Sequence, residues 1–509
     1  MQEERTLSTR QPVDLTNYVS NTDKNVYTIF NLPEEVIAVI FAYVSRSPKS
    51  FRENLRTLLE KEEILAQPGN QLLLSDTARR FHERWVVGYG HSSVAEHAVA
   101  HVGIEKISRL ASAELELANR FNSFTEYSQR YQRPQRGDFY IPVELERHPQ
   151  LRDAYIRFQH EAYDAYETLL AHLIPYLRNK FPRRENETEK AYDTRIEKLA
   201  FEDARYVLTL ATLTNLGMTG NGRALRDTLV VLLASPYPEC VRLAKEMEEE
   251  ISKVIPTLLR HVEASRHLQQ CFRQFHQDAA PDAGREASCG QPPAEADSAC
   301  EPNARPPRIQ MADYETVLNQ LCAGWLFSYR HLDYEESQQL AKQMSVTQKE
   351  EMLRTALVTL GPYDNPHPVF DQVRLKLFLT VSEANWHQLL RHNRRTAFIF
   401  QPPSPHGGIT VPPHIQEAGL TTVLLQVTEK AARLYRQIAA YAPTAAPYCV
   451  TNAHRRQIVA DLSLWELYHL INLRTSQEAQ WDIRGTFEHI HRQLAQTHPV
   501  IAEFAKRRP

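Results

Sequence analysis

The same succession of sequence patterns occurs twice, once on each side of a segment rich in alanine, proline and acidic residues. Each copy has an extended stretch with proline (138–142 and 409–413), then a long amphipathic helix, then a short apolar segment (204–208 and 446–450). The helices are predicted from apolar residues three and four positions apart: Leu151, Tyr155, Phe158, Ala162, Ala165, Leu169 and Leu173, and later Leu424, Val427, Ala431, Leu434 and Ile438. A diverged internal duplication is the economical interpretation, and it limits the chain to folds that pack two copies of one unit.

The segment between the copies, residues 271–308, contains few large apolar side chains. It cannot offset its ordering entropy by burial, so we expect a flexible linker. The predicted organisation is therefore an N-terminal extension over 1–29, a first repeat over 30–270, the linker, and a second, more diverged repeat over 309–509. Helical patterns dominate and a few strands accompany them, so the predicted fold class is α+β.

The composition is that of a soluble globular protein, with 42% hydrophobic and 24% charged residues among 509. A net charge of −3 gives no general attraction to nucleic acid or to an anionic membrane, so phosphate binding would have to come from local arginines. The sequence shows no run of about 18 apolar residues and no apolar signal segment at its start, so neither a membrane span nor export is predicted. Its six cysteines form no CxxC pair, which favours reduced thiols in the cytoplasm over disulfides or a zinc site.

Two further motifs have the wrong spacing for the chemistry that they suggest. Residues 91–97 combine two histidines with Glu96 but match neither HExxH nor HxxEH, so no metal site is predicted there. Residues 217–222 contain three glycines in an order that differs from GxGxxG, which we interpret as a helix kink or a close packing site. Neither GxxxxGK[ST] nor GxSxG occurs, so nucleotide hydrolysis and serine-esterase chemistry have no support.

Residues Arg120–Tyr131 concentrate a carboxylate, several hydroxyl groups and two arginines within twelve residues. This combination is suited to a phosphorylated polyol, because an arginine can bind phosphate oxygens through two parallel hydrogen bonds. Composition alone favours a solvated helix-to-loop edge with incidental charges, because exposed charge clusters usually have no specific role.

Several separated motifs resemble those of flavin-dependent thymidylate synthases. In the first repeat, residues 90–97 resemble their GHxSPxEH segment, and 120–131 resemble the second part of their RHRxxSxNExSxRY signature. Residues 204–208 and 221–225 are similar to the family's ARxVLP and NARSL segments. In the second repeat, 388–393 resemble the QxxRHR opening of the signature, and 472–484 resemble the NLR…AQWEIR ending. The resemblance covers roughly residues 30–265 and, more weakly, 310–505, and it implies that each tandem repeat is an antiparallel sheet packed with long helices.

Each repeat lacks many of the family's motif residues that the other repeat retains. The first has Ala118–Asn119, or the pair one residue earlier, in place of the RH pair, and Leu232 in place of the terminal arginine. The second has no ExSxRY segment, and Pro447, Ser463 and Trp465 replace residues of the ARxVLP and NAR segments. The retained sets add up to nearly one nucleotide site, so the resemblance implies a fused heterodimer with one site type.

The resemblance implies FAD-dependent methylation of dUMP to dTMP, with methylenetetrahydrofolate as carbon donor and NADPH as reductant. It implies a catalytic role for Arg474, whose charge would stabilise an enolate-like pyrimidine. The implied nucleotide-binding residues are Glu126, Ser128, Gln129, Arg130, Arg205, Gln388, Arg391 and Arg474. The implied flavin-binding residues are His91, Arg120, Asn221, Arg223, His392 and Asn393.

Members of this family are homotetramers with sites between subunits, so the resemblance also implies a homodimer of this chain that mimics the tetramer. Two alternatives stay open. One is a related flavoenzyme that acts on another pyrimidine nucleotide, since Asp227 and Trp465 could reshape the pocket. The other is an inactive nucleotide- or flavin-binding scaffold, since Asn393 replaces the third residue of the signature.

Overall fold

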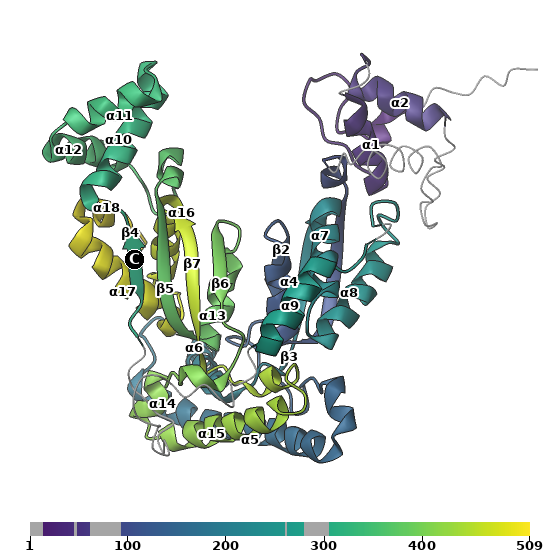
Figure 1. The fold of residues 1–509 in the computed structure, drawn as a ribbon, viewed down its shortest axis with the longest axis vertical. Coiled ribbons are helices and arrows are strands. Elements are labelled where there is room, and N and C mark those ends of the chain that lie inside the picture. The colour runs from purple at the N-terminus through teal and green to yellow at the C-terminus, as the bar shows by residue number, and fades with distance from the viewer. Residues whose placement is uncertain (1–13, 45–47, 62–92, 260–261, 279–304, 509) are drawn as a thin grey trace, which may run out of the picture. The chain divides into compact units, whose positions relative to one another are not determined.

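The computed structural model describes residues 14–44, 48–61, 93–259, 262–278 and 305–508 (Figure 1). His91 and most of the predicted linker lie outside these residues. The chain divides into two compact units: unit 1 is Met1–Glu105, Glu114–Glu126 and Asn215–Asp282, and unit 2 is Lys106–Ala113, Tyr127–Thr214 and Ala283–Pro509. Unit 2 therefore contains described residues from both sides of the predicted linker.

The elements before the predicted linker are η1 (Leu15–Asn17), α1 (Glu34–Val44), α2 (Phe51–Lys61), η3 (Val94–His97), β1 (Val99–Ser108), α4 (Arg109–Ala118), β2 (Ser123–Glu126), η4 (Val143–Arg147), α5 (Pro149–Lys180), α6 (Glu189–Ala204), η5 (Arg205–Val207), β3 (Leu213–Asn221), α7 (Gly222–Leu233), α8 (Pro238–Ile251) and α9 (Arg266–Asp278). Those that follow are β4 (Arg308–Met311), α10 (Tyr314–Arg330), α11 (Tyr334–Gln343), α12 (Val346–Leu357), η6 (Pro368–Gln372), β5 (Arg374–Ser382), α13 (Glu383–Leu389), η7 (Leu390–His392), β6 (Thr396–Phe400), η8 (Pro405–Gly407), α14 (Pro413–Glu417), α15 (Thr421–Ala439), η9 (Ala446–Cys449), β7 (Arg455–Ser463), α16 (Leu464–Arg474), α17 (Trp481–Thr497) and α18 (Pro499–Glu503).

The same order of elements appears in both repeats. The series β1, α4, β2, α5, η5, β3, α7 corresponds to β5, α13, β6, α15, η9, β7, α16. The strand orders also correspond, because β1-β3-β2 in one sheet matches β5-β7-β6 in the other, where β4 adds an edge strand. The registered strand pairs are antiparallel. The predicted α+β class, with two tandem repeats that each pack an antiparallel sheet with long helices, is confirmed.

The starts of two helices fix how the repeats align. Ser108 precedes α4 and Ser382 precedes α13. The hydroxyl oxygen of each serine accepts a hydrogen bond from the backbone N–H three residues further on, with an N–O distance of 3.0 Å in both cases. Counting from these N-caps places the pair Leu117–Ala118 opposite Arg391–His392. Of the two alignments that the sequence left open, the one that begins a residue earlier therefore agrees with the helices.

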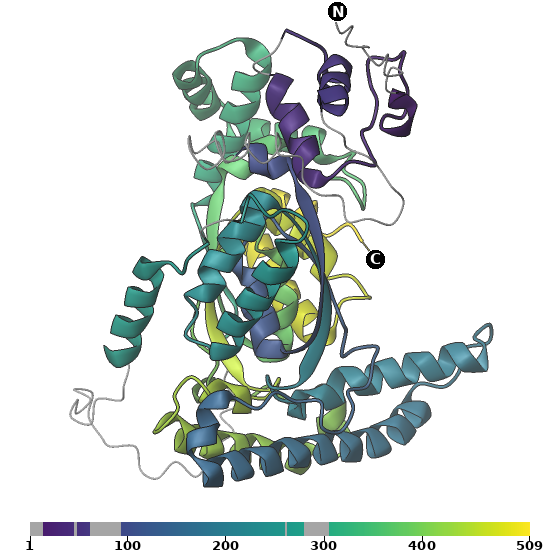
Figure 2. The same ribbon diagram turned by 90° about the vertical axis from the view of Figure 1, so that its right-hand side faces the viewer.

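The two long amphipathic helices are those that the periodicity predicted. Helix α5 begins with Pro149 at its first turn, where the missing N–H costs no hydrogen bond, and it buries residues such as Tyr155, Phe158 and Leu169. Helix α15 buries Leu424 and Ile438 on one face. Both helices belong to unit 2 and lie side by side (Figure 1 and Figure 2), so the helix of the first repeat packs against its counterpart in the second.

Equivalent backbone segments of the two repeats meet within unit 2. Thr209, just after η5, forms a β-bridge with Thr451, the equivalent residue just after η9. The N–H of Leu210 donates to the carbonyl of Val450 at 2.8 Å. In return the N–H of Asn452 donates to the carbonyl of Leu208, also at 2.8 Å. This reciprocity is the pattern of an isologous contact about a two-fold axis, here between two parts of one chain.

In the second sheet the core lies on one face. Alternate residues of β5 (Leu375, Leu377, Leu379 and Val381) are buried, as are Ile458, Ala460 and Leu462 of the neighbouring β7. Helices α13, α16 and α17 contact strands of this sheet. The alternation is the two-residue period of a sheet that is covered on one face. Among the helices that the structure describes, none is both long and apolar enough to cross a membrane.

Two glycines of residues 217–222 occupy close packing sites at the junction of β3 and α7. A Cβ at Gly220 would lie 2.3 Å from the side-chain oxygen of Asn122. At Gly222 it would lie 3.0 Å from the carbonyl oxygen of Ala95 and 2.9 Å from a methyl group of Leu258. The interpretation of this motif as a packing site, and not as a phosphate loop, agrees with these distances.

Candidate functional site

Unit 2 brings together four arginines that the sequence predicted from different repeats. Arg130 and Arg205 come from the first repeat, and Arg391 and Arg474 come from the second. The pKa of Arg474 is lowered to about 10, chiefly by burial and then by the positive charges of Arg391 and Arg130. Charges from both repeats therefore act on one guanidinium group, although about 340 residues separate Arg130 from Arg474 in the chain.

Arg130 reaches from the turn after β2 to the loop after α16. Its Nε donates to Glu202 at 2.7 Å, and its Nη2 donates to the carbonyl of Glu478 at 3.0 Å. The guanidinium group and the Glu202 carboxylate approach to 2.6 Å and are both largely buried, at 16% and 7% exposure of their side chains. This ion pair orients Arg130 beside the loop that directly follows Arg474.

Arg205 is buried at the beginning of η5, where burial lowers its pKa. Asn452, from the second repeat, donates one amide group both to the carbonyl of Arg205 at 2.9 Å and to the side-chain oxygen of Gln129 at 3.2 Å. Within the described part of the chain, Arg205 Nη2 and Gln129 Nε2 are buried and have no hydrogen-bond partner. Buried donors are normally satisfied, so these two fit a ligand that supplies acceptor oxygens.

A second set of hydrogen bonds joins the repeats next to the arginines. Gln388 Nε2 donates to Gln480 Oε1 at 3.3 Å, and Gln480 Nε2 donates to the hydroxyl of Tyr206 at 3.2 Å. The Tyr206 hydroxyl in turn donates to Asp482 at 2.8 Å. Tyr206 directly follows Arg205, so this network links Gln388 to the segment that carries another predicted nucleotide-binding residue.

Arg474 is held by the helix that carries the RH pair. Its Nε and Nη2 both donate to His392 Nε2, at 3.0 and 2.7 Å, and Nη2 also donates to the carbonyl of Gln388 at 3.1 Å. Burial, followed by the charge of Arg474, holds the pKa of His392 well below its usual range. The imidazole is therefore neutral near pH 7, as it must be to accept hydrogen bonds from a guanidinium group.

Three predicted flavin ligands that the structure describes lie in unit 1. The Asn221 side chain accepts the N–H of Ala224 at 2.9 Å and caps α7. Arg223 pairs with Glu96 at 2.6 Å, but both side chains are about half exposed, at 50% and 46%, so the pair is weak. Arg120 is exposed after α4. The other described members of the predicted set, His392 and Asn393, lie in unit 2.

The remaining predicted nucleotide ligands lie along the short stretch that leaves β2. Glu126 is buried at the last position of the strand, in unit 1. Ser128 follows in unit 2, where its hydroxyl accepts the N–H of Arg130 at 3.3 Å. The structure thus gathers Ser128, Gln129, Arg130, Arg205, Gln388, Arg391 and Arg474 in unit 2.

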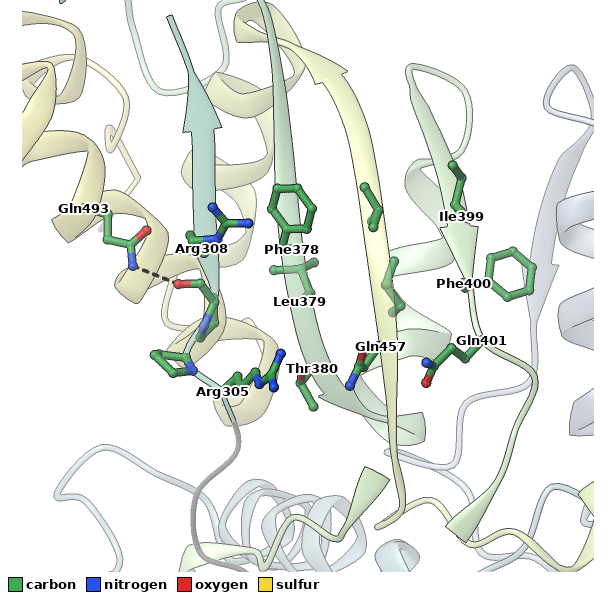
Figure 3. A pocket seen from close by; sticks show the side chains of 14 residues that line it. Arg305, Arg308, Phe378, Leu379, Thr380, Ile399, Phe400, Gln401, Gln457 and Gln493 are labelled. Carbon is green, nitrogen blue, oxygen red and sulfur yellow. Dashed lines mark hydrogen bonds between the residues drawn. The ribbon is translucent and has the colours of Figure 1, made fainter. Parts of the chain in front are cut away.

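A separate cleft of about 610 Å³ lies on the second sheet (Figure 3). Side chains of β5, β6 and β7 line it, including Phe378, Ile399 and Gln457, and Arg305 and Arg308 lie at one side. Arg308 stacks over the ring of Phe378 at 4.2 Å. No predicted nucleotide or flavin ligand lines this cleft, so it is distinct from the arginine cluster.

Sequence reasoning missed Asn452, Gln480 and Glu466. The pattern that could have found two of them is a polar residue at a position that is apolar in the other repeat. Asn452 stands opposite Leu210, and Glu466 stands opposite Ala224 when Asn221 is aligned with Ser463. A buried polar residue that replaces an apolar one needs a partner, and that need indicates a specific contact.

Comparison with known proteins agrees with this internal symmetry. The family model described as "Thymidylate synthase complementing protein" matches residues 28–257 and again 323–500. The chain therefore belongs to that family, and it carries the family domain twice.

Relatives similar over the full length are the UPF0159 proteins of Chlamydia muridarum, 24% identical over 99% of this chain and 96% of that protein, and of Thermoplasma acidophilum, 23% identical over 91% and 94%. Flavin-dependent thymidylate synthases match over part of the chain. That of Mycobacterium bovis is 32% identical over 36% of this chain and 69% of that protein. Among solved structures, the UMP/dUMP methylase PolB from Streptomyces cacaoi is 12% identical over 40% of this chain and 97% of that chain, with a TM-score of 0.31.

Proposed function

We propose that this protein methylates dUMP to dTMP in the cytoplasm, with FAD as cofactor, methylenetetrahydrofolate as carbon donor and NADPH as reductant. The observation that carries the proposal is the arginine cluster of unit 2, because the charge of Arg130 from the first repeat acts both on Arg205 and, together with that of Arg391, on Arg474 of the second repeat. The first repeat, proposed over 30–270, and the second, over 309–509, would then build one nucleotide site together.

The cluster suits a nucleotide phosphate. Arg130, Arg205, Arg391 and Gln388 would bind its oxygens, and each charge-assisted hydrogen bond contributes roughly 1.5–3 kcal/mol before desolvation. The free donor of Arg205 is already buried, so it would lose no further solvation when the phosphate arrives. Ser128 and Gln129 would bind the nucleotide from the turn after β2, and Glu126 would orient the sugar or a neighbouring arginine.

Arg474 is the proposed catalytic residue. Placed against a pyrimidine oxygen, its guanidinium group would stabilise the negative charge that develops when C5 becomes nucleophilic, so that no protein nucleophile is required. The contacts with His392 and with the Gln388 carbonyl hold it in place before the substrate binds.

The residues proposed to bind flavin have, each by itself, chemistry suited to a cofactor with a diphosphate and a polar ring. Arg120 and Arg223 are both exposed, the latter at 50% of its side chain, and they carry the charge that a diphosphate needs. His392 is neutral and would touch the flavin without adding charge, while its Nε2 accepts hydrogen bonds from Arg474. With His91, Asn221 and Asn393 they form the proposed flavin-binding set. The bound flavin would supply the redox chemistry of the reaction.

The proposal includes a homodimer of this chain, in which four repeats reproduce the family's tetramer. The reciprocal hydrogen bonds at Thr209 and Thr451 support it, because two repeats of one chain already meet as two symmetric subunits would. Calorimetry should give one dUMP and one FAD per chain. Two nucleotides per chain would contradict the single site type.

Expression in a thymidine auxotroph tests the proposal directly. The wild-type gene should restore growth without thymidine, and Arg474→Ala should not, whereas Arg157→Ala, which changes an exposed arginine of α5, should behave as wild type. Purified protein should be yellow and should bind dUMP. No uptake of FAD at micromolar concentration would refute both this enzyme and a related flavoenzyme. Turnover of another pyrimidine nucleotide in place of dUMP would favour the related flavoenzyme, and binding without turnover would favour the scaffold.

A further inference from the structure

We propose that Glu466 is a positioning residue for Arg474 and acts through His392. This inference rests on the proposed function, because it explains how the proposed catalytic guanidinium group is held. Glu466 is buried in the first turn of α16, and its Oε1 lies 3.6 Å from His392 Nδ1. The opposite nitrogen of the same ring, Nε2, accepts both hydrogen bonds from Arg474.

The two sides of the imidazole have different roles. A neutral imidazole carries one hydrogen, and Nε2 must lack it in order to accept from Arg474. The hydrogen therefore sits on Nδ1, on the side of Glu466. A carboxylate at that position favours this tautomer and makes Nε2 a better acceptor, as carboxylates do behind metal-bound and catalytic histidines.

Comparison of the two repeats indicates that the three groups work as a set. In the first repeat the positions of Glu466, His392 and Arg474 are held by Ala224, Ala118 and Leu232. The repeat that would provide the catalytic arginine thus has all three polar groups, and the other repeat has none. A carboxylate that only stabilised the fold would have no reason to accompany the arginine.

The charges around Glu466 shape its ionisation. Burial raises its pKa to about 8, the charge of Asp371 raises it as well, and the charge of Arg395 opposes them. Arg395 pairs with Asp371 at 2.9 Å. Ser463, at the N-cap of α16, accepts the N–H of Glu466 at 3.3 Å and donates to Asp371 at 2.8 Å. The carboxylate, which polarises His392 most strongly, therefore forms as the pH rises through about 8.

His392, Glu466 and His469 lie close enough together to suggest a metal site, with one ligand atom from each within 4.8 Å of the others. The surrounding charges oppose a cation. Arg474 donates to the nitrogen of His392 that faces away from Glu466, and the positive charges of Arg474, Arg508 and Arg395 lower the pKa of His469, after burial. A proton on Nδ1 satisfies the ring without adding charge, so we assign His392 and Glu466 to holding Arg474 and not to binding a metal ion.

The test compares full-length wild type with Glu466→Gln, Glu466→Ala and Glu429→Gln, the last a change of an exposed glutamate on α15. At pH 9, where Glu466 is ionised, we expect kcat of both Glu466 variants to be about 10- to 100-fold below that of wild type, as is usual for the loss of a group behind a functional histidine. KM for dUMP should change less than about threefold, because the phosphate arginines are intact. The rise of kcat between pH 7 and 9 should disappear in Glu466→Gln and remain in Glu429→Gln.

Nitrogen-15 NMR of labelled histidines in the full chain provides a measurement that does not need turnover. The His392 signals, assigned by their loss in His392→Gln and recorded at pH 9, should show the Nδ1–H tautomer in wild type and a shift toward Nε2–H in Glu466→Ala. An unchanged kcat and pH profile in Glu466→Gln, or an Nε2–H tautomer in wild type, overturns the positioning role. If wild type shows the Nδ1–H tautomer but does not turn over dUMP, the proposed function fails and the positioning of Arg474 still stands.

Discussion

Removing Arg130 and Arg474, singly and together, tests whether the two repeats serve one nucleotide. Loss of one charge-assisted contact in a preorganised site costs about 2–4 kcal/mol. Each single alanine variant should therefore lower kcat/KM for dUMP roughly 30- to 900-fold. Because both groups would act on the same bound molecule, the double variant should cost at least about 1 kcal/mol less than the sum of the two.

The structure separates effects on binding from effects on folding. Arg130→Ala leaves the largely buried Glu202 carboxylate without its partner, so the free energy of unfolding should fall by about 1–3 kcal/mol. Arg474→Ala removes a charge that Arg391 and Arg130 repel, and this relief offsets the lost hydrogen bonds to His392. Its free energy of unfolding should stay within about 1 kcal/mol of wild type. If the single and double variants are also made in a Glu202→Gln background, the loss of stability from an unpaired Glu202 carboxylate is removed.

The assay is dUMP binding by calorimetry on the full chain, together with turnover followed by release of tritium from C5. Arg157→Ala controls for loss of an arginine from unit 2 outside the cluster. Wild-type turnover in Arg474→Ala would refute the shared site. The shared site would also be refuted if the effects of the two single variants add to that of the double variant within about 0.3 kcal/mol, because independent sites behave in this way. Activity from residues 1–270 alone would refute it as well.

Three further changes probe how unit 2 is held together. Asn452→Ala should lower the free energy of unfolding by about 1–3 kcal/mol and weaken dUMP binding, because one buried amide serves both Gln129 and Arg205; an unchanged urea midpoint would count against it. Glu383→Gln breaks a buried bidentate pair with Arg456, 2.8 Å at each contact, and should cost about 3–5 kcal/mol, seen as a lower Tm. Burial lowers the pKa of His454 to about 4, so the unfolded chain binds its proton first as the pH falls below about 6.5. At pH 5 this should cost about 2 kcal/mol relative to pH 7, and His454→Gln should lack that component in urea titrations at the two values.

Periodicity predicted the long helices because their burial is local and regular. Residues that repeat every three or four positions must share a face whatever that face contacts, so α5 and α15 followed from their own sequences. The sequences of the stretches 138–142 and 409–413 predict extended structure. Each makes only a single β-bridge, Phe139 to Thr212 and Ile409 to His454, and the partners are again equivalent in the two repeats.

The partners of the site residues could not be predicted in this way. Motif matching suggested that Arg130 and Arg474 act together, but it gave no contact for either. Arg130 contacts Glu202 and the Glu478 carbonyl, which lie 72 and 348 residues away from it in the chain. Such long-range contacts depend on how segments cross, which no local pattern records.

The presence of both repeats in one chain explains why some equivalent positions of unit 2 carry different residues and others carry the same residue. In a homodimer every substitution appears on both sides of the axis, so a residue must suit both environments. In one chain the two copies can change separately. Thr209 and Thr451 face each other in a β-bridge across the axis and are identical, since each is the other's environment. One residue further along, Leu210 and Asn452 have separated, and only Asn452 needs polar partners. It finds them in Gln129 and the Arg205 carbonyl, on the side where the arginines of both repeats gather. The two repeats thus differ already one residue from the axis, and the polar residue there contacts residues of the proposed nucleotide site. This is expected if divergence kept one of two equivalent sites.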